Sequence, residues 1–228
     1  DAGAQGAQLV LDRGGLVGED GPTHHGVFDV SFLRVVPNLV LMAPRNEAEL
    51  DGMLHFSGHL PGPSAIRYPR GSGTGVDQHH LDQPIVLGKA EICREGKQIA
   101  ILSLGTTTDA ALQAANNLAH QGIDAMVINP RFIKPLDTTL LESLFRRRLP
   151  IVTIEEGTLI GGFGAAVLEV ASELGYTPTI LRIGLPDHFA TQGSLRELRA
   201  MYGLDADGIT RRIHEWNASR SSMIKAAC

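Results

Sequence analysis

The sequence predicts an α/β fold with two successive βα domains. Short apolar runs with the character of buried strands alternate with segments that begin with helix-capping residues, and this order is typical of parallel sheets covered by helices. The run at residues 99–104 is almost continuously apolar, which suits a strand buried on both faces. A stretch rich in Gly, Asp, Gln and His at residues 71–84 separates the two series and is interpreted as an interdomain linker.

The composition argues against several classes of protein. The 228 residues have a net charge of -5 and a pI of about 6.0, which does not suit a nucleic-acid-binding surface. A hydrophobic content of 43% and a mean hydropathy near zero fit a packed core. Two cysteines give no disulfide framework. No apolar run approaches the roughly 20 residues of a membrane span, and the start lacks a signal peptide. From the charge and from these two observations, we expect neither nucleic acid nor membrane as a partner.

The first series begins with a predicted strand at residues 9–11. The further elements expected in it are a short helix at 27–33, a strand at 39–43, a helix at 47–57 and a strand at 64–68. Asn46 suits the N-cap of the longer helix, because its side-chain oxygen can accept from a backbone N–H near the helix start. Pro37 and Pro44 end the elements that precede them.

The second series predicts a mostly parallel five-stranded sheet. Strands are expected at residues 84–94, 99–104, 123–128, 151–156 and 179–183, the first of them at an edge, and helices at 109–121, 138–146, from 161 onward, at 194–202 and at 205–216. Thr108 is the expected cap of the first helix and Gly122 its end. The segment 130–137 is expected to be a loop, and residues 217–228 a polar, frayed tail.

These elements divide the chain into four parts. We expect a first domain at residues 1–73, a linker and edge strand at 74–95, a second domain at 96–217 and a tail at 218–228. His79 and His80 lie in the linker. Because no Cys, Asp or Glu lies near them at ligand spacing, we interpret the two imidazoles as solvated rather than as metal ligands, and no metal site is predicted.

The loop at residues 12–26 is the densest cluster of chemical groups in the chain. It follows the first strand, contains five glycines and has no helical periodicity. Arg13 can hold a phosphate or a carboxylate in a fork. Asp20 and His24 can accept from and donate to a hydroxyl or a carbonyl oxygen. We interpret this segment as a ligand-binding loop rather than a solvated turn.

Arg70 follows the strand at 64–68 as Arg13 follows the strand at 9–11. Ligands of parallel sheets bind beyond the carboxyl ends of the strands. The two guanidinium groups can therefore converge on one ligand, although they are far apart in sequence. Taken alone, Arg70 would be interpreted as one half of a surface ion pair.

Two other motifs are interpreted as structural. Glu155 and Glu156 could share a proton, but neighbours on a strand point to opposite faces, which favours a structural or interface role. The glycine-rich segment 161–164 opens a helix, yet it has neither the spacing of a dinucleotide-binding fingerprint nor the lysine of a P-loop. Close packing of the helix explains its glycines better than a phosphate cradle does.

Four segments of the chain form a combined motif. They are DRGGLVGEDGPTHHG at residues 12–26, SAIRYPRG at 64–71, RFIKPLD at 131–137 and IGLPD at 183–187. In this order they resemble the 1-deoxy-D-xylulose-5-phosphate synthases, thiamine-diphosphate enzymes related to transketolase. The resemblance extends from about residue 1 to residue 216. It implies that the first domain is a remnant of a thiamine pyrimidine-binding domain and that the second is a transketolase-type C-terminal domain.

The resemblance also implies a reaction and residue roles. The family condenses pyruvate with glyceraldehyde 3-phosphate and releases carbon dioxide, using thiamine diphosphate and Mg²⁺, and its product feeds isoprenoid, thiamine and pyridoxal synthesis. By motif position, Arg13 and Arg70 would clamp the acceptor's phosphate. Asp20 and His24 would be the catalytic residues that hydrogen-bond substrate hydroxyls and the thiamine-bound intermediate. A homodimer in the cytoplasm, or in a plastid for a plant-like source, is implied as well.

In that family, the domain that binds the diphosphate and Mg²⁺ and the glutamate that activates thiamine both precede the matched region. We therefore expect this chain to be a fragment that contains the acceptor-phosphate side of the active site, with no residue assigned to the cofactor and no activity in isolation. Two alternatives stay open, a β-subunit-like piece of a 2-oxo acid dehydrogenase and a non-catalytic dimerisation module.

Overall fold

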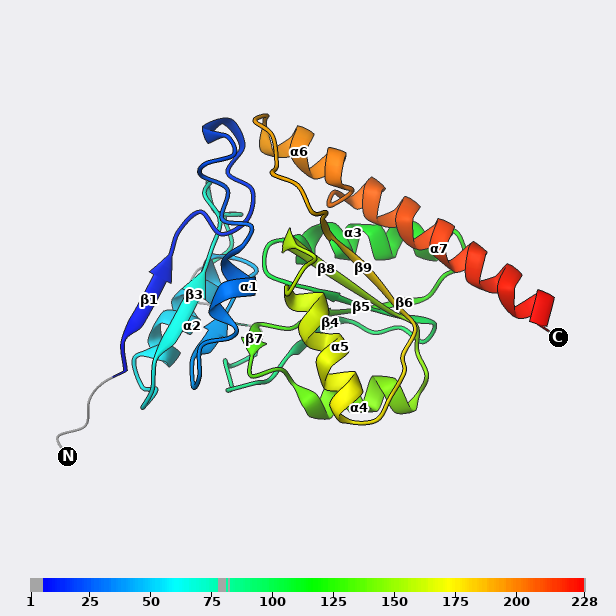
Figure 1. The fold of residues 1–228 in the computed structure, drawn as a ribbon, viewed down its shortest axis with the longest axis horizontal. Helices are drawn as coiled ribbons and strands as arrows, with labels where there is room; N and C mark the ends of the chain where they lie inside the picture. The colour runs from blue at the N-terminus through cyan, green and yellow to red at the C-terminus, as the bar shows by residue number, and fades with distance from the viewer. Residues whose placement is uncertain (1–5, 78–80, 82, 228) are drawn as a thin grey trace.

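Two β-sheets lie side by side in the structure, a computed structural model that describes residues 6–77, 81 and 83–227, with side chains up to residue 220 (Figure 1). The strands are β1 (Gln8–Leu11), β2 (Val40–Met42), β3 (Ser64–Arg67), β4 (Glu91–Arg94), β5 (Ile99–Ser103), β6 (Ala125–Asn129), β7 (Phe132–Lys134), β8 (Ile151–Thr158) and β9 (Ile180–Leu185). The helices are η1 (Gly18–Asp20), α1 (Asp29–Leu33), α2 (Glu47–Ser57), α3 (Thr107–His120), α4 (Thr138–Arg146), α5 (Phe163–Glu173), α6 (Leu195–Tyr202) and α7 (Ala206–Ala227).

The first sheet has the order β1-β3-β2-β7. β1 and β2 both pair with β3 in parallel, whereas β7 pairs with β2 in antiparallel orientation. The prediction of a loop at residues 130–137 is therefore wrong for residues 132–134, which form β7. Pro130 and Pro135 favour a loop locally, but Phe132 is fully buried in the core of the first sheet, so long-range packing outweighs the local signal. The second series of elements thus completes the sheet of the first.

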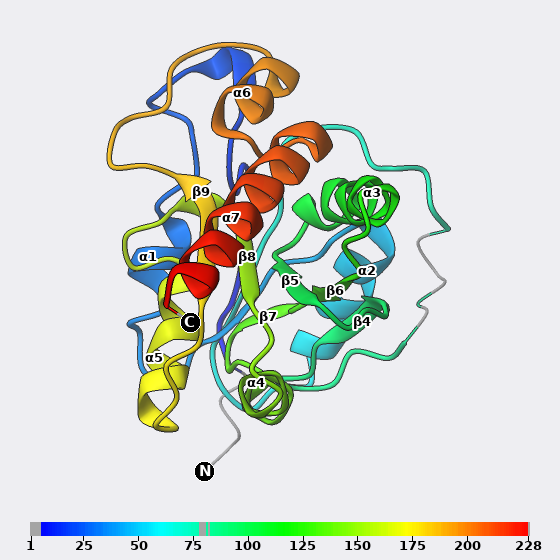
Figure 2. The same ribbon diagram turned by 90° about the vertical axis from the view of Figure 1, so that its right-hand side faces the viewer.

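The second sheet confirms the prediction of five mostly parallel strands. Its order is β4-β6-β5-β8-β9, and only the pairing of β4 with β6 is antiparallel. Helices α3 and α7 cover one face, and α4 and α5 cover the other (Figures 1 and 2). Apolar residues of β5, β6 and β8 that face α3 and α7 form one core cluster, and those that face α4 and α5 form another. This layering explains the almost continuous apolar character of the central strands.

Three expected elements differ from those observed. The edge strand expected at 84–94 forms only at β4, because Pro84 cannot donate to a ladder and Gly88 turns the chain with a φ of 65°. Thr108 is not the cap of α3 but lies inside it, where its hydroxyl donates to the carbonyls of Ser103 and Gly105. The frayed tail expected from residue 217 continues as helix α7 to Ala227, because residues 217–227 contain no Gly or Pro.

The two sheets share a hydrophobic core. Successive residues of a strand point to opposite faces. In β2, Leu41 faces a cluster that includes Ile128 and Phe163 of the second sheet and its helices, while Met42 faces α2. The first sheet is therefore packed between its own helix α2 and the second βα series, which joins the two series along a continuous apolar contact. The limits of the expected domains stay a prediction.

Buried ion pairs reinforce this junction. The side chain of Arg131, just before β7, donates from Nε to Oε1 of Glu49 on α2 at 2.6 Å. Asn129 donates to the same carboxylate at 2.9 Å, and Glu91 lies 3.4 Å from the Arg131 guanidinium. Glu49, Glu91 and Arg131 are each at most 3% exposed. Because a buried charge that loses its partner costs about 3–5 kcal/mol, removal of any one member of this network should destabilise the packing of α2 on β6 and β7.

Within the described part of the chain, no helix has both the length and the apolar content that a membrane crossing requires.

Candidate functional site

The carboxyl ends of three parallel strands meet at one edge of the first sheet. β1 is followed by the loop at residues 12–26, β2 by the turn at 43–46 and β3 by the segment 68–74. In Figure 1, the loop after β1 rises above the sheet and approaches helix α6 of the second series. This edge brings together the residues that the sequence places after the strands.

Arg13 and Arg70 converge on the carboxylate of Asp20. Nη1 of Arg70 lies 2.5 Å from Oδ2 of Asp20, and Nε of Arg13 lies 3.8 Å from the same oxygen. Arg13 also pairs with Asp12 at 2.7 Å. The side chains of Arg13 and Arg70 remain 44% and 49% exposed, so both guanidinium groups are open to a ligand from solvent. The expected convergence of the two arginines is therefore present in the structure, while their role in binding stays a prediction.

The side chain of His24 forms its hydrogen bond outside this ion-pair cluster. Its Nδ1 is 3.0 Å from the hydroxyl of Thr23, and its backbone N–H donates to the carbonyl of Gly21. The side chain is exposed. The structure thus places the imidazole on a neighbouring hydroxyl rather than on Asp20, and the roles expected for Asp20 and His24 stay predictions.

The two adjacent glutamates of β8 point to opposite faces, as expected. Glu155 accepts from the backbone N–H groups of Phe163 and Gly164 at 2.7 and 2.9 Å. Burial raises the pKa of the Glu155 carboxyl, and these hydrogen bonds oppose that shift. These two N–H donors at the start of α5 are therefore already occupied by a side chain of the protein itself. This contact explains why the glycine-rich segment before α5 is a packing motif and not a phosphate cradle.

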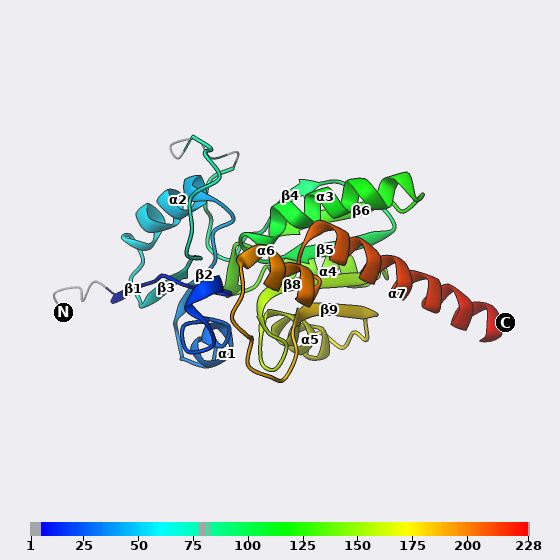
Figure 3. The same cartoon turned by 90° about the horizontal axis from the view of Figure 1, so that it is seen from above.

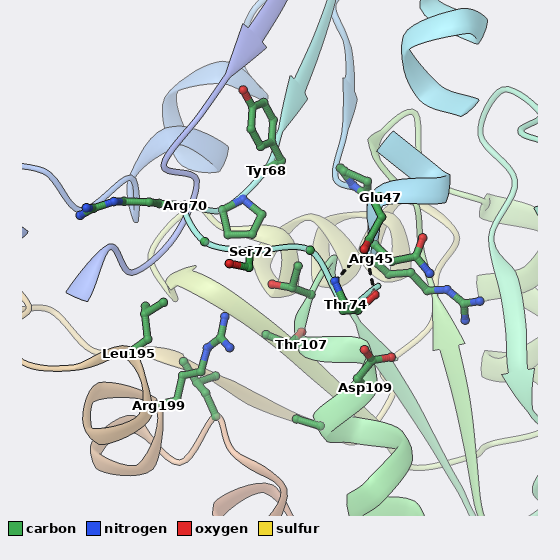
Figure 4. Close-up of a pocket in the computed structure, with 18 of the residues that line it drawn as sticks. Arg45, Glu47, Tyr68, Arg70, Ser72, Thr74, Thr107, Asp109, Leu195 and Arg199 are labelled. Carbon is green, nitrogen blue, oxygen red and sulfur yellow. Dashed lines mark hydrogen bonds between the residues drawn. The ribbon is translucent and has the colours of Figure 1, made fainter. Parts of the chain in front are cut away.

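A cavity of about 650 Å³ separates the carboxyl edge of the first sheet from the second series. Its walls are the turn after β2, the segment 68–74, the N-terminal turn of α3 and residues of α6 and its turn into α7. In Figure 4, Arg199 reaches from α6 toward Ser72, whereas the Arg70 side chain extends away from the cavity. Arg70 therefore lies between the cavity and the loop at 12–26.

Glu47 holds the segment that forms one wall of the cavity. Its carboxylate accepts from the backbone N–H and hydroxyl of Thr74 at 3.0 and 2.8 Å (Figure 4), and from the backbone N–H of Gly75 at 2.6 Å. Sequence reasoning placed Glu47 only in the first turn of α2, because nothing local signals a contact that spans more than 25 residues. This carboxylate therefore holds the segment that follows Arg70 in the sequence.

Metal ligands do not cluster in the described residues. No group of three or more His, Cys, Asp or Glu side chains there could hold a metal ion. His79 and His80, interpreted as solvated, lie outside the described residues.

Two stretches of the chain match domains of known protein families. A family model described as the transketolase C-terminal domain matches residues 88–209, and one described as the transketolase pyrimidine-binding domain matches residues 1–74. The chain is 49% identical over 206 residues to 1-deoxy-D-xylulose-5-phosphate synthase 1 of Geobacter metallireducens and 50% identical over 208 residues to the synthase of Gloeobacter violaceus. Both matches cover 90% of this chain, but only 33% and 32% of the relatives. The chain thus spans about a third of the length of these relatives.

Solved structures agree with this fold. A split-gene transketolase, solved as an inactive beta4 tetramer, superposes with a TM-score of 0.79 at 29% identity, covering 91% of this chain and 65% of that chain. Transketolase from Campylobacter jejuni superposes with a TM-score of 0.71 at 20% identity, covering 91% of this chain and 31% of that one, which supports the fold alone.

The Glu47 contact generates a prediction about pH. Hydrogen bonds from its own backbone N–H and from those of Gly75 and Thr74 lower the pKa of the Glu47 carboxyl from 4.5 to about 2. Since the folded pKa is lowered, the stabilisation is fully present above 4.5 and is lost as pH falls through about 2. NMR shifts of the Thr74 and Gly75 amides should titrate near pH 2. The E47Q variant should abolish that titration, and a midpoint near 4.5 in the wild-type chain would contradict the assignment.

Proposed function

Because the chain belongs to the transketolase family, we propose that it contains the acceptor-phosphate side of a 1-deoxy-D-xylulose-5-phosphate synthase. The observation that carries the proposal is the convergence of Arg13 and Arg70 on Asp20 at the carboxyl edge of the first sheet. The two guanidinium groups that pair with this carboxylate remain partly exposed, and each can also donate charge-assisted hydrogen bonds to phosphate oxygens. Identity of 49% to a synthase over 90% of the chain supports the reaction class.

In this proposal, the substrates are pyruvate and glyceraldehyde 3-phosphate, which condense with loss of carbon dioxide. Arg13 and Arg70 bind the phosphate of the acceptor and so orient the aldehyde that reacts. Asp20 lies beside both guanidinium groups and can accept from a hydroxyl of the bound acceptor. His24, on the same loop, moves a proton at the reacting oxygen once the acceptor is bound.

Thiamine diphosphate and Mg²⁺, which the family resemblance implies, would supply the carbanion chemistry of the reaction. The described residues contain no cluster of three or more metal ligands. We therefore assign neither Mg²⁺ nor the diphosphate to this chain. No comparison reported above favours a 2-oxo acid dehydrogenase or a purely structural module. A location in the cytoplasm or a plastid stays a prediction.

Removal of either arginine tests the phosphate site. We expect R70A and R13A each to weaken binding of inorganic phosphate and of glyceraldehyde 3-phosphate about 10- to 100-fold, because a hydrogen bond to a charged group is worth about 1.5–3 kcal/mol. Isothermal titration calorimetry of the 228-residue chain measures both affinities.

Arg146 provides the matched control for these variants. It is an exposed arginine that pairs with Glu142 at 2.7 Å on α4, distant from the strand ends of the first sheet. R146A should leave both affinities unchanged. Equal losses in R70A and R146A would mean that phosphate binds by diffuse charge, and the proposed site would be wrong.

The chain by itself should not catalyse the condensation. It spans about a third of the synthases that it resembles, and the split-gene transketolase with a similar fold is described as inactive in its beta4 form. A coupled assay with pyruvate, glyceraldehyde 3-phosphate, thiamine diphosphate and Mg²⁺ should show no product above the enzyme-free rate. Turnover that disappears in R70A would overturn this expectation.

We further propose a homodimer, supported by an apolar surface on the outer side of α1. Phe28, Phe32, Ile160 and Phe189 are 40%, 59%, 60% and 73% exposed, and Phe28 packs edge-to-face on Phe189. Exposed apolar clusters of this kind mark interfaces. Sedimentation velocity should show a dimer that F32E converts to monomer. M201E, which changes an equally exposed residue on α6, should leave the dimer intact, and a wild-type monomer at all concentrations would contradict the proposal.

A further inference from the structure

The loop at residues 12–26 belongs to the first series, but the second series holds it in place. We propose that Glu156 and His25 are positioning residues that fix this loop on the C-terminal series and so set the affinity of the anion site. The part of the inference that concerns affinity rests on the proposed function. Neither residue needs to contact the ligand, because each acts through the backbone of the loop.

Glu156, at the end of β8, joins the loop to α6. Its Oε1 accepts from the backbone N–H of Leu16 at 3.1 Å, and its Oε2 accepts from Nη2 of Arg199 at 2.9 Å. The carboxylate is 4% exposed and Leu16 is fully buried. Gly15 has a φ of 93°, and a Cβ at this position would lie 3.1 Å from Cγ of Glu156. The close approach of the loop to Glu156 therefore depends on glycine.

His25 forms the second attachment, at the other end of the loop. Its Nδ1 is 3.0 Å from the backbone nitrogen of Val17, and its Nε2 is 3.1 Å from the carbonyl oxygen of Thr191. A backbone N–H can only donate and a carbonyl can only accept. Nδ1 is therefore the acceptor and Nε2 bears the proton, which assigns a single neutral tautomer. The ring, 8% exposed, thus bridges the loop and the segment that precedes α6.

The residues between these two attachments pack on the same segment. The side chain of Gln192 donates to the carbonyl of Glu19 at 3.0 Å. A Cβ at Gly18 would lie 3.3 Å from the carbonyl oxygen of Gly193 and 3.4 Å from the nitrogen of Leu195. Figures 2 and 3 both show the loop beside α6. Helix η1, which includes Asp20, is therefore held from the side of the second series.

In this arrangement, Asp20 and Arg70 are held by different parts of the molecule. Asp20 lies on the loop that the second series holds, whereas Arg70 follows β3 of the first sheet. The distance between their charged groups depends on both series. Asp20 pairs with the guanidinium groups of both Arg13 and Arg70 and so orients them. Because a displacement of about 1 Å in a binding group can change its effect markedly, release of the loop should weaken anion binding without removing any ligand contact.

The E156Q variant tests the inference, and E155Q is its matched control. Both residues are buried neighbours on β8 that accept from backbone N–H groups, but Glu155 serves α5 and Glu156 serves the loop. In E156Q, amide hydrogen exchange at residues 16–20 should accelerate at least about tenfold, because the variant opens the loop locally. The affinity for inorganic phosphate should fall by about fivefold or more. E155Q should lower the melting temperature but change neither quantity.

A pair of substitutions at His25 provides an independent readout if E156Q does not fold. In H25N, the side-chain oxygen can replace Nδ1 as the acceptor for Val17, while H25L removes both hydrogen bonds. Val17 should keep most of its exchange protection in H25N and lose it in H25L. Equal protection in the two variants and in the wild type would overturn the role of His25.

The two readouts separate this inference from the proposed function. Fast exchange at residues 16–20 in E156Q, together with no phosphate binding by the wild-type chain, would support the attachment and refute the proposed anion site. Phosphate binding by the wild-type chain, with exchange and affinity equal in E155Q and E156Q, would support the site and overturn the inference.

Discussion

The buried contact between the two βα series governs the rest of the structure. Arg131 pairs with Glu49 at 2.6 Å in a region closed to solvent, and β7 adds to the edge of the first sheet immediately after it. Glu156 then reaches the loop at residues 12–26 and attaches it to the second series. The charged residues of the proposed site thus all belong to the first series, while the second series holds the loop that contains Arg13 and Asp20.

Much of the fold follows from local patterns in the sequence. The βα alternation and the continuous apolar strands predicted the sheet types and nearly all elements correctly, and Asn46 marked the start of α2. These signals act over a few residues and can therefore be detected in the sequence. β7 was missed because three residues between prolines have no periodicity to detect. Its strand state comes from pairing with β2 and from burial of Phe132, which only the folded chain creates.

The same division between local and distant signals applies to the site. The convergence of Arg13 and Arg70 could be predicted, because parallel strands place their carboxyl ends at one edge. The partners that hold the site could not be predicted. Glu47 binds Thr74, and His25 binds the carbonyl of Thr191, so each contact joins residues that no motif connects. Glu156 was correctly given a structural or interface role, but its partner on the loop lies 140 positions away.

The pairing of β7 with β2 also restricts how the two series can be rearranged during evolution. A recombination event that replaced everything after the linker would remove residues 132–134 and leave β2, still paired with β3, as an open edge beside an exposed apolar face. Such edges promote aggregation. Chimeras of this protein with a distant relative should therefore tolerate a breakpoint in the linker only when the incoming half brings a strand that can pair with β2.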